Sequence, residues 1–235
     1  MKLCEMNYTV STCVYEKEQS LEDQEITDPM AVEYRKLQQL IFAKLVNTEK
    51  NKSLLETIPH EPMLDLSLVF YMYRNNDPEQ EEILITNEML KQWKVDYFQL
   101  FEDAFSNTRQ VMGAYIRPLR DMIGDMIKDI SFDVDLTEDQ DAMPMYVLTN
   151  RWKRNGAVCI LFWDMVMELA EKLESDLLVI PSSIHEVILI PEGQGVEGEE
   201  LNRLIRSVNE SELNPKDVLS DHAYRFPRKE GHLVL

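Results

Sequence analysis

The sequence predicts an α+β fold in which helices pack against a largely antiparallel sheet, and three patterns support this. The densest apolar run holds two short segments, Leu177 to Ile180 and Val187 to Ile190, separated by a small polar insert, as in two adjacent buried strands. Residues 64–73 alternate apolar and polar positions as a half-buried strand does. Residues 118–130 instead place apolar side chains at helical spacing, which favours a helix packed on a core.

The N-terminal part of the chain is predicted to be helical. Asp28 followed by Pro29 is a helix start signal, because Asp caps a helix and Pro suits its first position. An apolar stripe at helical spacing follows: Tyr34, Leu37, Ile41 and Leu45. A second short helix is expected over residues 49–58. Residues 1–27 show no period and are expected to form a flexible arm, so residues 28–235 are predicted to be a single domain with a helical N-terminal part.

Turn and cap signals place the next elements. Asn75 to Pro78 is turn chemistry, so residues 83–85 are expected to pair with the preceding strand as a hairpin. Thr86 or Asn87 is expected to cap a helix, and Asp96 a second one. Helices are also expected over residues 165–173 and 201–208, followed by a terminal hairpin.

A basic turn is the one concentrated positive patch in the sequence. Residues 145–148 and 157–162 are expected to be strands on either side of it. Its candidate binding residues are Arg151, Trp152, Lys153 and Arg154. This combination can stack on a base or hold an anion, whereas internal salt bridges are the more ordinary role for such residues in an acidic protein.

The overall charge of the chain favours some partners over others. There are 43 acidic and 24 basic residues, giving a formal net charge of −19. Such a surface repels nucleic acid phosphates, so direct nucleic acid binding is disfavoured, whereas a basic protein partner is attracted. The simplest alternative is that the charge only keeps the protein soluble.

The sequence gives no metal or cofactor motif, and none is expected. Acidic residues crowd over positions 133–141, but an EF-hand loop starting at Asp133 requires Gly and Glu where Glu138 and Pro144 stand. Cys4, Cys13 and Cys159 share no ligand spacing, which is typical of a reduced chain. Without a secretory signal or a bilayer-spanning run, we expect a cytoplasmic protein with no membrane contact.

Ser183 and His185 are the candidate catalytic residues. They lie beside Ser182 and Glu186, and a nucleophile, a base and an orienting acid are the ingredients of acyl transfer. Strand alternation, however, directs His185 and Glu186 to opposite faces, and no Gly-x-Ser-x-Gly elbow is present. We therefore favour a structural role, in which the serines bond turn amides and His185 bonds the backbone.

Several segments carry a family resemblance: residues 58–66, 85–87, 145–150, 181–191 and 218–221 followed by Tyr224 and Arg225. They resemble a bacterial family described only as a domain of unknown function, from about Asp28 to the end. That resemblance implies an accessory protein that is often encoded on mobile elements, and a chain shorter at its N-terminus than usual members. It implies no catalytic residue.

Three functional hypotheses follow. The first is a non-enzymatic interaction protein whose acidic surface docks a basic partner, in its sharper form a nucleic-acid mimic that inhibits a defence or DNA-handling protein. The second is a hydrolase that uses His185 with Ser183 or a distant acid. The third is nucleic-acid binding through Arg151 to Arg154. The oligomeric state is left open.

Overall fold

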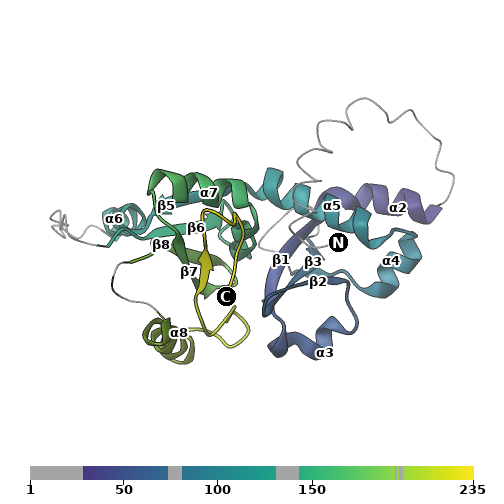
Figure 1. Cartoon of the computed structure of the whole chain (residues 1–235). Helices are drawn as coiled ribbons and strands as arrows, with labels where there is room; N and C mark the ends of the chain where they lie inside the picture. Colours follow the sequence, from purple (N-terminus) through teal and green to yellow (C-terminus); the bar gives the residue numbers. More distant parts are fainter. Residues whose placement is uncertain (1–28, 74–80, 131–142, 194, 196–197) are drawn as a thin grey trace. The chain divides into compact units, whose positions relative to one another are not determined.

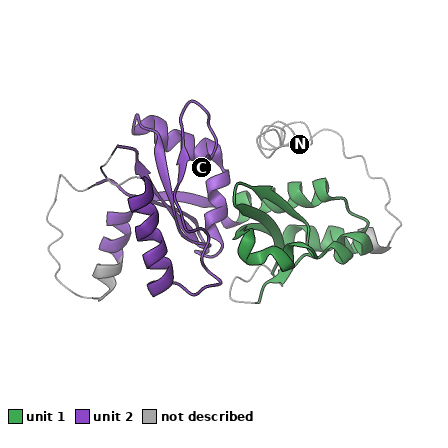
Figure 2. Ribbon diagram, turned by 60° about the horizontal axis from the view of Figure 1, so that its bottom comes forward, with its two compact units in different colours: residues 1–111 green, residues 112–235 purple. Residues whose placement is uncertain are grey.

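The computed structural model describes residues 29–73, 81–130, 143–193, 195 and 198–235 (Figure 1). They form two compact units divided between residues 111 and 112 (Figure 2). The expected arm over residues 1–27, the Asn75 to Pro78 turn and the acidic run over residues 133–141 lie outside the described residues. Two compact units can still unfold together, so a single domain over residues 28–235 stays a prediction. Monitoring unfolding separately in each unit would test it.

Unit 1 is a small antiparallel sheet with helices. In chain order its elements are α2 (Pro29–Leu37), η2 (Gln38–Leu40), β1 (Ile41–Asn47), η3 (Glu49–Asn51), α3 (Lys52–Leu55), β2 (His60–Met63), β3 (Leu66–Met72), β4 (Ile83–Leu84), α4 (Asn87–Trp93) and α5 (Tyr97–Asn107). β3 is the central strand and pairs with β1 along its whole length. β2 and β4 share the other edge of β3.

The predicted N-terminal helix is wrong beyond Leu37, because Ile41–Asn47 is the strand β1. This run contains Ile, Phe, Leu and Val and has seven partners in β3, from Ile41 opposite Met72 to Asn47 opposite Leu66. Only Lys44 among its residues is not buried. Pairing with β3 and burial of both faces therefore determine the structure of this run. The helical spacing of four apolar residues, two of which lie in the run, does not.

The predicted strand over residues 64–73 is confirmed as β3, but it is not half-buried. Every residue from Leu66 to Tyr71 is buried. One face carries Phe70, whose ring lies edge-on to Tyr97 and Phe101 of α5. The other face carries Val69, which packs with Leu55 of α3. Both faces of this sheet are therefore covered, which alternation in a single strand does not reveal.

Unit 2 is a five-stranded antiparallel sheet in the order β5-β6-β8-β7-β9. Its elements are η5 (Thr108–Met112, which begins in unit 1), β5 (Ala114–Pro118), α6 (Leu119–Ile130), β6 (Tyr146–Asn150), η6 (Gly156–Leu161), α7 (Trp163–Lys172), β7 (Leu177–Ser183), β8 (Glu186–Pro191), α8 (Gly198–Glu212) and β9 (Tyr224–Phe226). The α+β class and the largely antiparallel pairing predicted from the sequence are confirmed.

α8 covers one face of this sheet, where Leu201 and Ile205 pack on Leu178 and Ile190. Figure 1 shows α7 on the other side of the same strands. Two asparagines hold α8 to the C-terminal segment. Asn202 Oδ1 accepts from the Ala223 backbone N–H at 2.9 Å, and Asn209 Nδ2 donates to the Ser220 carbonyl at 3.0 Å.

Several predicted elements of both units are confirmed. The caps are Thr86, which accepts from Met89 N–H, and Asp96, which accepts from Gln99 N–H. β4 pairs with β3, and β7 with β8, as expected. The terminal hairpin is present as β9 with a single bridge between Arg225 and Val234.

In unit 2 one strand prediction is wrong, and the described part of one predicted helical stripe is more exposed than expected. Residues 157–162 are not a strand, because the buried 3₁₀ helix η6 occupies them and β6 pairs with β5 and β8 instead. The stripe on α6 was expected to face the core, but of its described side chains Ile123 is 42% exposed and Met122 is only half-buried, and the side chains of Met126, Ile127 and Ile130 lie outside the description. A helical stripe shows that a face is apolar; it does not show what covers that face.

Candidate functional site

The turn between β7 and β8 is the centre of the candidate site, which we call the His185 site and define as Thr149, Asn155, Gly156, Ser183, His185 and Asp217. Ser183 and Glu186 are opposite each other in the β7–β8 ladder, so Ile184 and His185 form the turn itself. The sequence suggested that His185 lies in the second strand of the hairpin. In the structure it lies in the turn that precedes β8. The Ser183 Oγ accepts a hydrogen bond from the His185 backbone N–H at 3.0 Å, which closes the turn.

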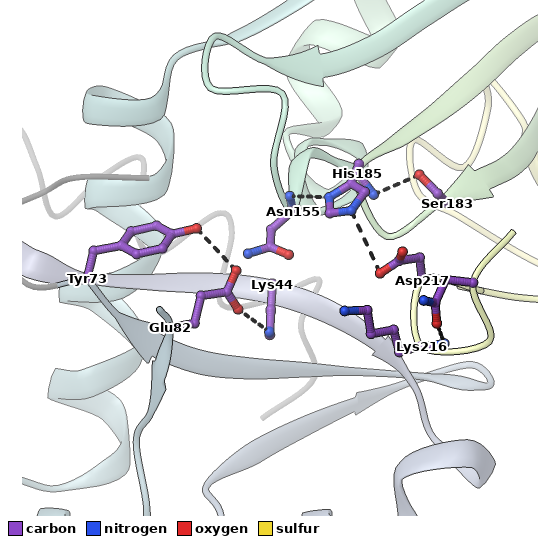
Figure 3. A network of polar contacts seen from close by, with 9 residues as sticks. Lys44, Tyr73, Glu82, Asn155, Ser183, His185, Lys216 and Asp217 are labelled. Atoms are coloured by element: carbon purple, nitrogen blue, oxygen red, sulfur yellow. Dashed lines mark hydrogen bonds and ion pairs between the residues drawn. The ribbon is translucent and has the colours of Figure 1, made fainter. Parts of the chain in front are cut away.

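The His185 ring is held on two sides (Figure 3). Its Nδ1 accepts a hydrogen bond from the Asn155 backbone N–H at 3.1 Å. Its Nε2 lies 3.9 Å from Asp217 Oδ1. Because a backbone N–H can only donate, Nδ1 presents its lone pair and the neutral ring carries its proton on Nε2, toward the carboxylate.

Gly156 lets the loop before η6 approach the β7–β8 turn closely. A Cβ at this position would lie 2.2 Å from Thr149 Oγ1 and 2.5 Å from the His185 carbonyl oxygen. Those two groups already bond each other, since Thr149 Oγ1 donates to the His185 carbonyl at 2.8 Å. Only glycine fits this contact, which places the loop where Asn155 meets the His185 ring.

Asp217 reaches the site from a loop after α8. The Ile184 backbone N–H donates to the Asp217 carbonyl at 2.9 Å, so the loop is attached to the turn by its backbone as well as by its carboxylate. The loop is itself closed by a bond from Asp217 N–H to the Asn214 carbonyl at 2.8 Å. Three segments distant in sequence therefore converge on His185.

The contacts at the His185 site are those of a structural junction. A general base for Ser183 needs a ring lone pair directed at the serine hydroxyl. In this tautomer the lone pair is on Nδ1 and is engaged by Asn155 N–H. Ser183 is buried and contacts the backbone of His185. Ser182 Oγ is 3.4 Å from Glu186 Oε1, so the neighbouring acid bonds a serine and not the imidazole.

The basic loop, residues 151–154, has a fixed backbone. Arg151 N–H donates to the carbonyls of Met112 and Gly113, and Lys153 N–H donates to the Asn150 carbonyl. The buried Asn150 side chain donates to the Arg154 carbonyl at 2.8 Å. Arg151 and Lys153 are exposed, whereas Trp152 and Arg154 are half-buried. Two of the four predicted binding residues, Arg151 and Lys153, are thus exposed.

The remaining histidines each contact a nearby carbonyl group. The Nδ1 atoms of His60, His222 and His232 lie near the carbonyls of Ile58, Ala223 and Glu230 respectively. Within the described ranges, no three His, Cys, Asp or Glu side chains gather as a metal-ion site requires. In the same part of the chain, no helix has the length and apolar character needed to cross a bilayer.

Unit 1 contains a polar cluster that sequence reasoning missed (Figure 3). Lys44 Nζ pairs with Glu82 Oε2 at 2.5 Å, and both side chains are less than one-fifth exposed, at 14% and 16%. Tyr73 donates its hydroxyl proton to Glu82 Oε1 at 3.1 Å. The Lys44 ammonium also lies 5.3 Å from the centroid of the Tyr71 ring. Lys44 had been placed within a predicted helix, where no partner could be foreseen.

Asn155 and Asp217 were also missed as members of the His185 site. Asn155 and Gly156 form a pair typical of turns, a signal that was visible but was assigned to a hairpin. Asp217 carries no comparable signal, because its contact with His185 depends on how α8 and the following loop cross the sheet.

The fold and the site together define a two-unit α+β protein in which the β7–β8 turn and two loops meet at His185. The chain belongs to the family described as Family of unknown function (DUF5688), which matches residues 3–228. The match includes most of the expected N-terminal arm, which the sequence resemblance had left out. No curated protein and no solved structure matches the chain.

Proposed function

We propose that this protein is a non-enzymatic interaction protein whose acidic surface binds a basic protein partner. The observation that carries the proposal is the formal net charge of −19. A field of this size steers a basic partner to the surface and repels polyanions. The engaged lone pair of His185 also supports a role other than catalysis.

α7 is the surface that best fits such docking. Asp164, Glu168 and Glu171 are all exposed and follow one another at spacings of four and three residues, so they share one helical face. The opposite face is buried through Val166, Leu169 and Ala170. A rigid helix whose outer face carries three carboxylates suits a partner with Lys and Arg side chains in a row.

The sharper form of the proposal is that this protein is encoded on a bacterial mobile element and acts in the cytoplasm. It would inhibit a basic nucleic-acid-handling or defence protein by occupying that protein's nucleic-acid site. The acidic composition and the resemblance stated above support this form.

The test is a pull-down from bacterial lysate, followed by affinity measurements on the purified partner at low and moderate salt. The α7 variant is Asp164→Asn, Glu168→Gln, Glu171→Gln. Its matched control neutralises the exposed Glu200, Glu210 and Glu212 of α8. We expect a basic partner whose affinity falls about tenfold or more in the α7 variant, and falls steeply with salt. Equal losses in both variants would point to net charge alone, and a partner insensitive to salt would contradict docking by charge.

A second candidate is nucleic-acid binding through Arg151, Trp152, Lys153 and Arg154. The observation that favours it is the hydrogen-bonded backbone of this loop, which presents Arg151 and Lys153 in fixed positions. Fluorescence anisotropy with a single-stranded oligonucleotide tests it, using Arg151→Gln/Lys153→Gln against Lys52→Gln/Lys91→Gln. Loss of oligonucleotide binding in Arg151→Gln/Lys153→Gln but not in Lys52→Gln/Lys91→Gln supports this candidate. The hydrolase hypothesis based on Ser183 and His185 stays a prediction, and an ester-substrate screen of the wild type and Ser183→Ala tests it.

A further inference from the structure

A pocket lies beside the C-terminal hairpin of unit 2, and of the three carboxylates proposed for docking on α7 it shares only Glu171. Its volume is about 400 Å³, which is within the range of small-molecule sites. α7 contributes Met167 and Glu171 to its wall, and residues 227–230 contribute the turn that follows β9. Asp176 and Arg225 complete the lining.

Two of the pocket's charged groups, Arg225 and Asp176, already have partners within the protein. Arg225 Nη2 lies 2.7 Å from Glu192 Oε2 and 3.8 Å from Asp176 Oδ2. Asp176 Oδ1 in turn accepts from the Arg228 backbone N–H at 3.0 Å. These contacts fix the turn against the start of β7 and leave Arg225 and Asp176 largely satisfied.

The charges that remain come from two walls: Arg228, Lys229 and Glu230 on the turn, where Glu230 Oε2 lies 3.9 Å from His232 Nε2, and Glu171 on α7. On the turn, Lys229 has no ion pair within the described part of the chain, and Arg228 Nε is as far as 4.0 Å from Asp176 Oδ1. On α7, the exposed Glu171 carboxylate likewise has no hydrogen bond or ion pair with any described residue. Apolar surface from Met167 and Pro227 lines the same hollow.

We propose that this pocket binds a small zwitterion in which an aliphatic chain separates a carboxylate from an ammonium group. The carboxylate is held by Arg228 and Lys229, the ammonium by Glu171, and the chain contacts Met167 and Pro227. An anion alone leaves Glu171 unpaired beside it, and an amine alone lies beside the Arg228 and Lys229 cations, so each single charge meets repulsion that the zwitterion avoids.

The probe for the test is ε-aminocaproate, with caproate and hexylamine as compounds that keep only one of its charges, and norleucine as the isomer whose charges are adjacent. Calorimetric titration gives the affinities, and backbone amide NMR shifts at Lys229 to Gly231 locate the binding. We expect ε-aminocaproate to bind, and both single-charge compounds to bind at least about tenfold more weakly. Norleucine is expected to be weaker as well, because its ammonium and carboxylate are attached to the same carbon and no aliphatic chain separates them.

Two variants and two matched controls test which pocket residues bind the two charged ends of ε-aminocaproate. Glu171→Gln and Lys229→Gln are expected to weaken ε-aminocaproate about tenfold or more, whereas Glu168→Gln and Lys172→Gln, exposed on the same helix but outside the pocket, leave it unchanged. All four positions are at the surface, and circular dichroism confirms that each variant is folded. The proposal is overturned if the wild type does not bind ε-aminocaproate, if caproate or hexylamine binds equally well, or if the pocket variants behave like the controls.

Discussion

The backbone N–H of Asn155 donates to Nδ1 of His185 across 30 positions of sequence, at a distance of 3.1 Å. Asn155 is only 1% exposed, so water cannot replace the imidazole as its partner. The bond joins the loop before η6 to the turn between β7 and β8. His185 therefore supplies the acceptor for a buried backbone N–H, and replacing it is expected to destabilise the loop that carries Arg151 to Arg154.

His185→Phe keeps a planar ring but removes the acceptor, leaving a buried N–H unpaired. We expect unit 2 to lose about 1–3 kcal/mol in free energy of unfolding, measured by urea denaturation. His185→Asn is the matched control, since its side-chain oxygen offers an acceptor near the position of Nδ1. A phenylalanine variant as stable as the wild type would contradict the structural role of the ring.

Gly156→Ala tests the close approach of the same loop. The added Cβ meets the Thr149 hydroxyl and the His185 carbonyl, and the carbonyl belongs to backbone that cannot move alone. We expect a loss of about 3 kcal/mol or more in thermal or urea unfolding. Gly193→Ala is the comparison, because a Cβ there meets no atom within 4 Å and adds only the cost of its positive φ, about 1 kcal/mol. Equal effects of the two changes would show that the loop can shift.

Cys159 is expected to be unreactive in the folded protein. Burial raises the pKa of its thiol from 9.0 to about 12, so the reactive thiolate is about a thousandfold rarer than for an ordinary cysteine at the same pH. A variant with Cys4→Ser and Cys13→Ser leaves this thiol as the chain's single cysteine. Ellman's reagent at pH about 8 should label it only after denaturant is added. Rapid labelling of the folded variant would contradict the buried position of η6.

The sequence predicts the fold class and most local elements because those depend on neighbouring residues. The caps at Thr86 and Asp96 and the β7–β8 hairpin need only short-range information, and all are present. The wrong predictions concern segments whose secondary structure depends on contacts with residues distant in the sequence. Residues 41–47 match a helical stripe, but pairing with β3 makes them a strand. Residues 157–162 have strand composition, but they fill the interior as a 3₁₀ helix.

The candidate site was predictable only in part, for the same reason. Ser183 and His185 could be singled out, and their closeness to each other is a property of the turn. The partners that give the ring its role, Asn155 and Asp217, come from loops after β6 and after α8. No pattern in one sequence encodes which loops will cross the end of a hairpin, so the sequence favoured a structural role for His185 but could not name Asn155 and Asp217 as its partners.

The pair formed by Lys44 and Glu82 supplies the last prediction, which concerns a charge pair held inside unit 1. Lys44→Met removes the ammonium that pairs with Glu82 Oε2, while the Tyr73 hydroxyl still donates to Glu82 Oε1. A carboxylate deprived of its counter-charge in a poorly solvated position is costly, and we expect a loss of about 3 kcal/mol in free energy of unfolding.

The double variant Lys44→Met/Glu82→Gln also removes the negative charge of Glu82, while the glutamine oxygen still accepts from the Tyr73 hydroxyl. We therefore expect it to be more stable than Lys44→Met alone, by about 1 kcal/mol or more, in the same urea titration. Lys91→Met with Glu88→Gln is the exposed control, because that pair is more than 70% exposed and should contribute about 0.5 kcal/mol or less. If the double variant is less stable than the single one, the Glu82 carboxylate stabilises unit 1 through contacts other than Lys44, and the role of the ion pair must be reassigned.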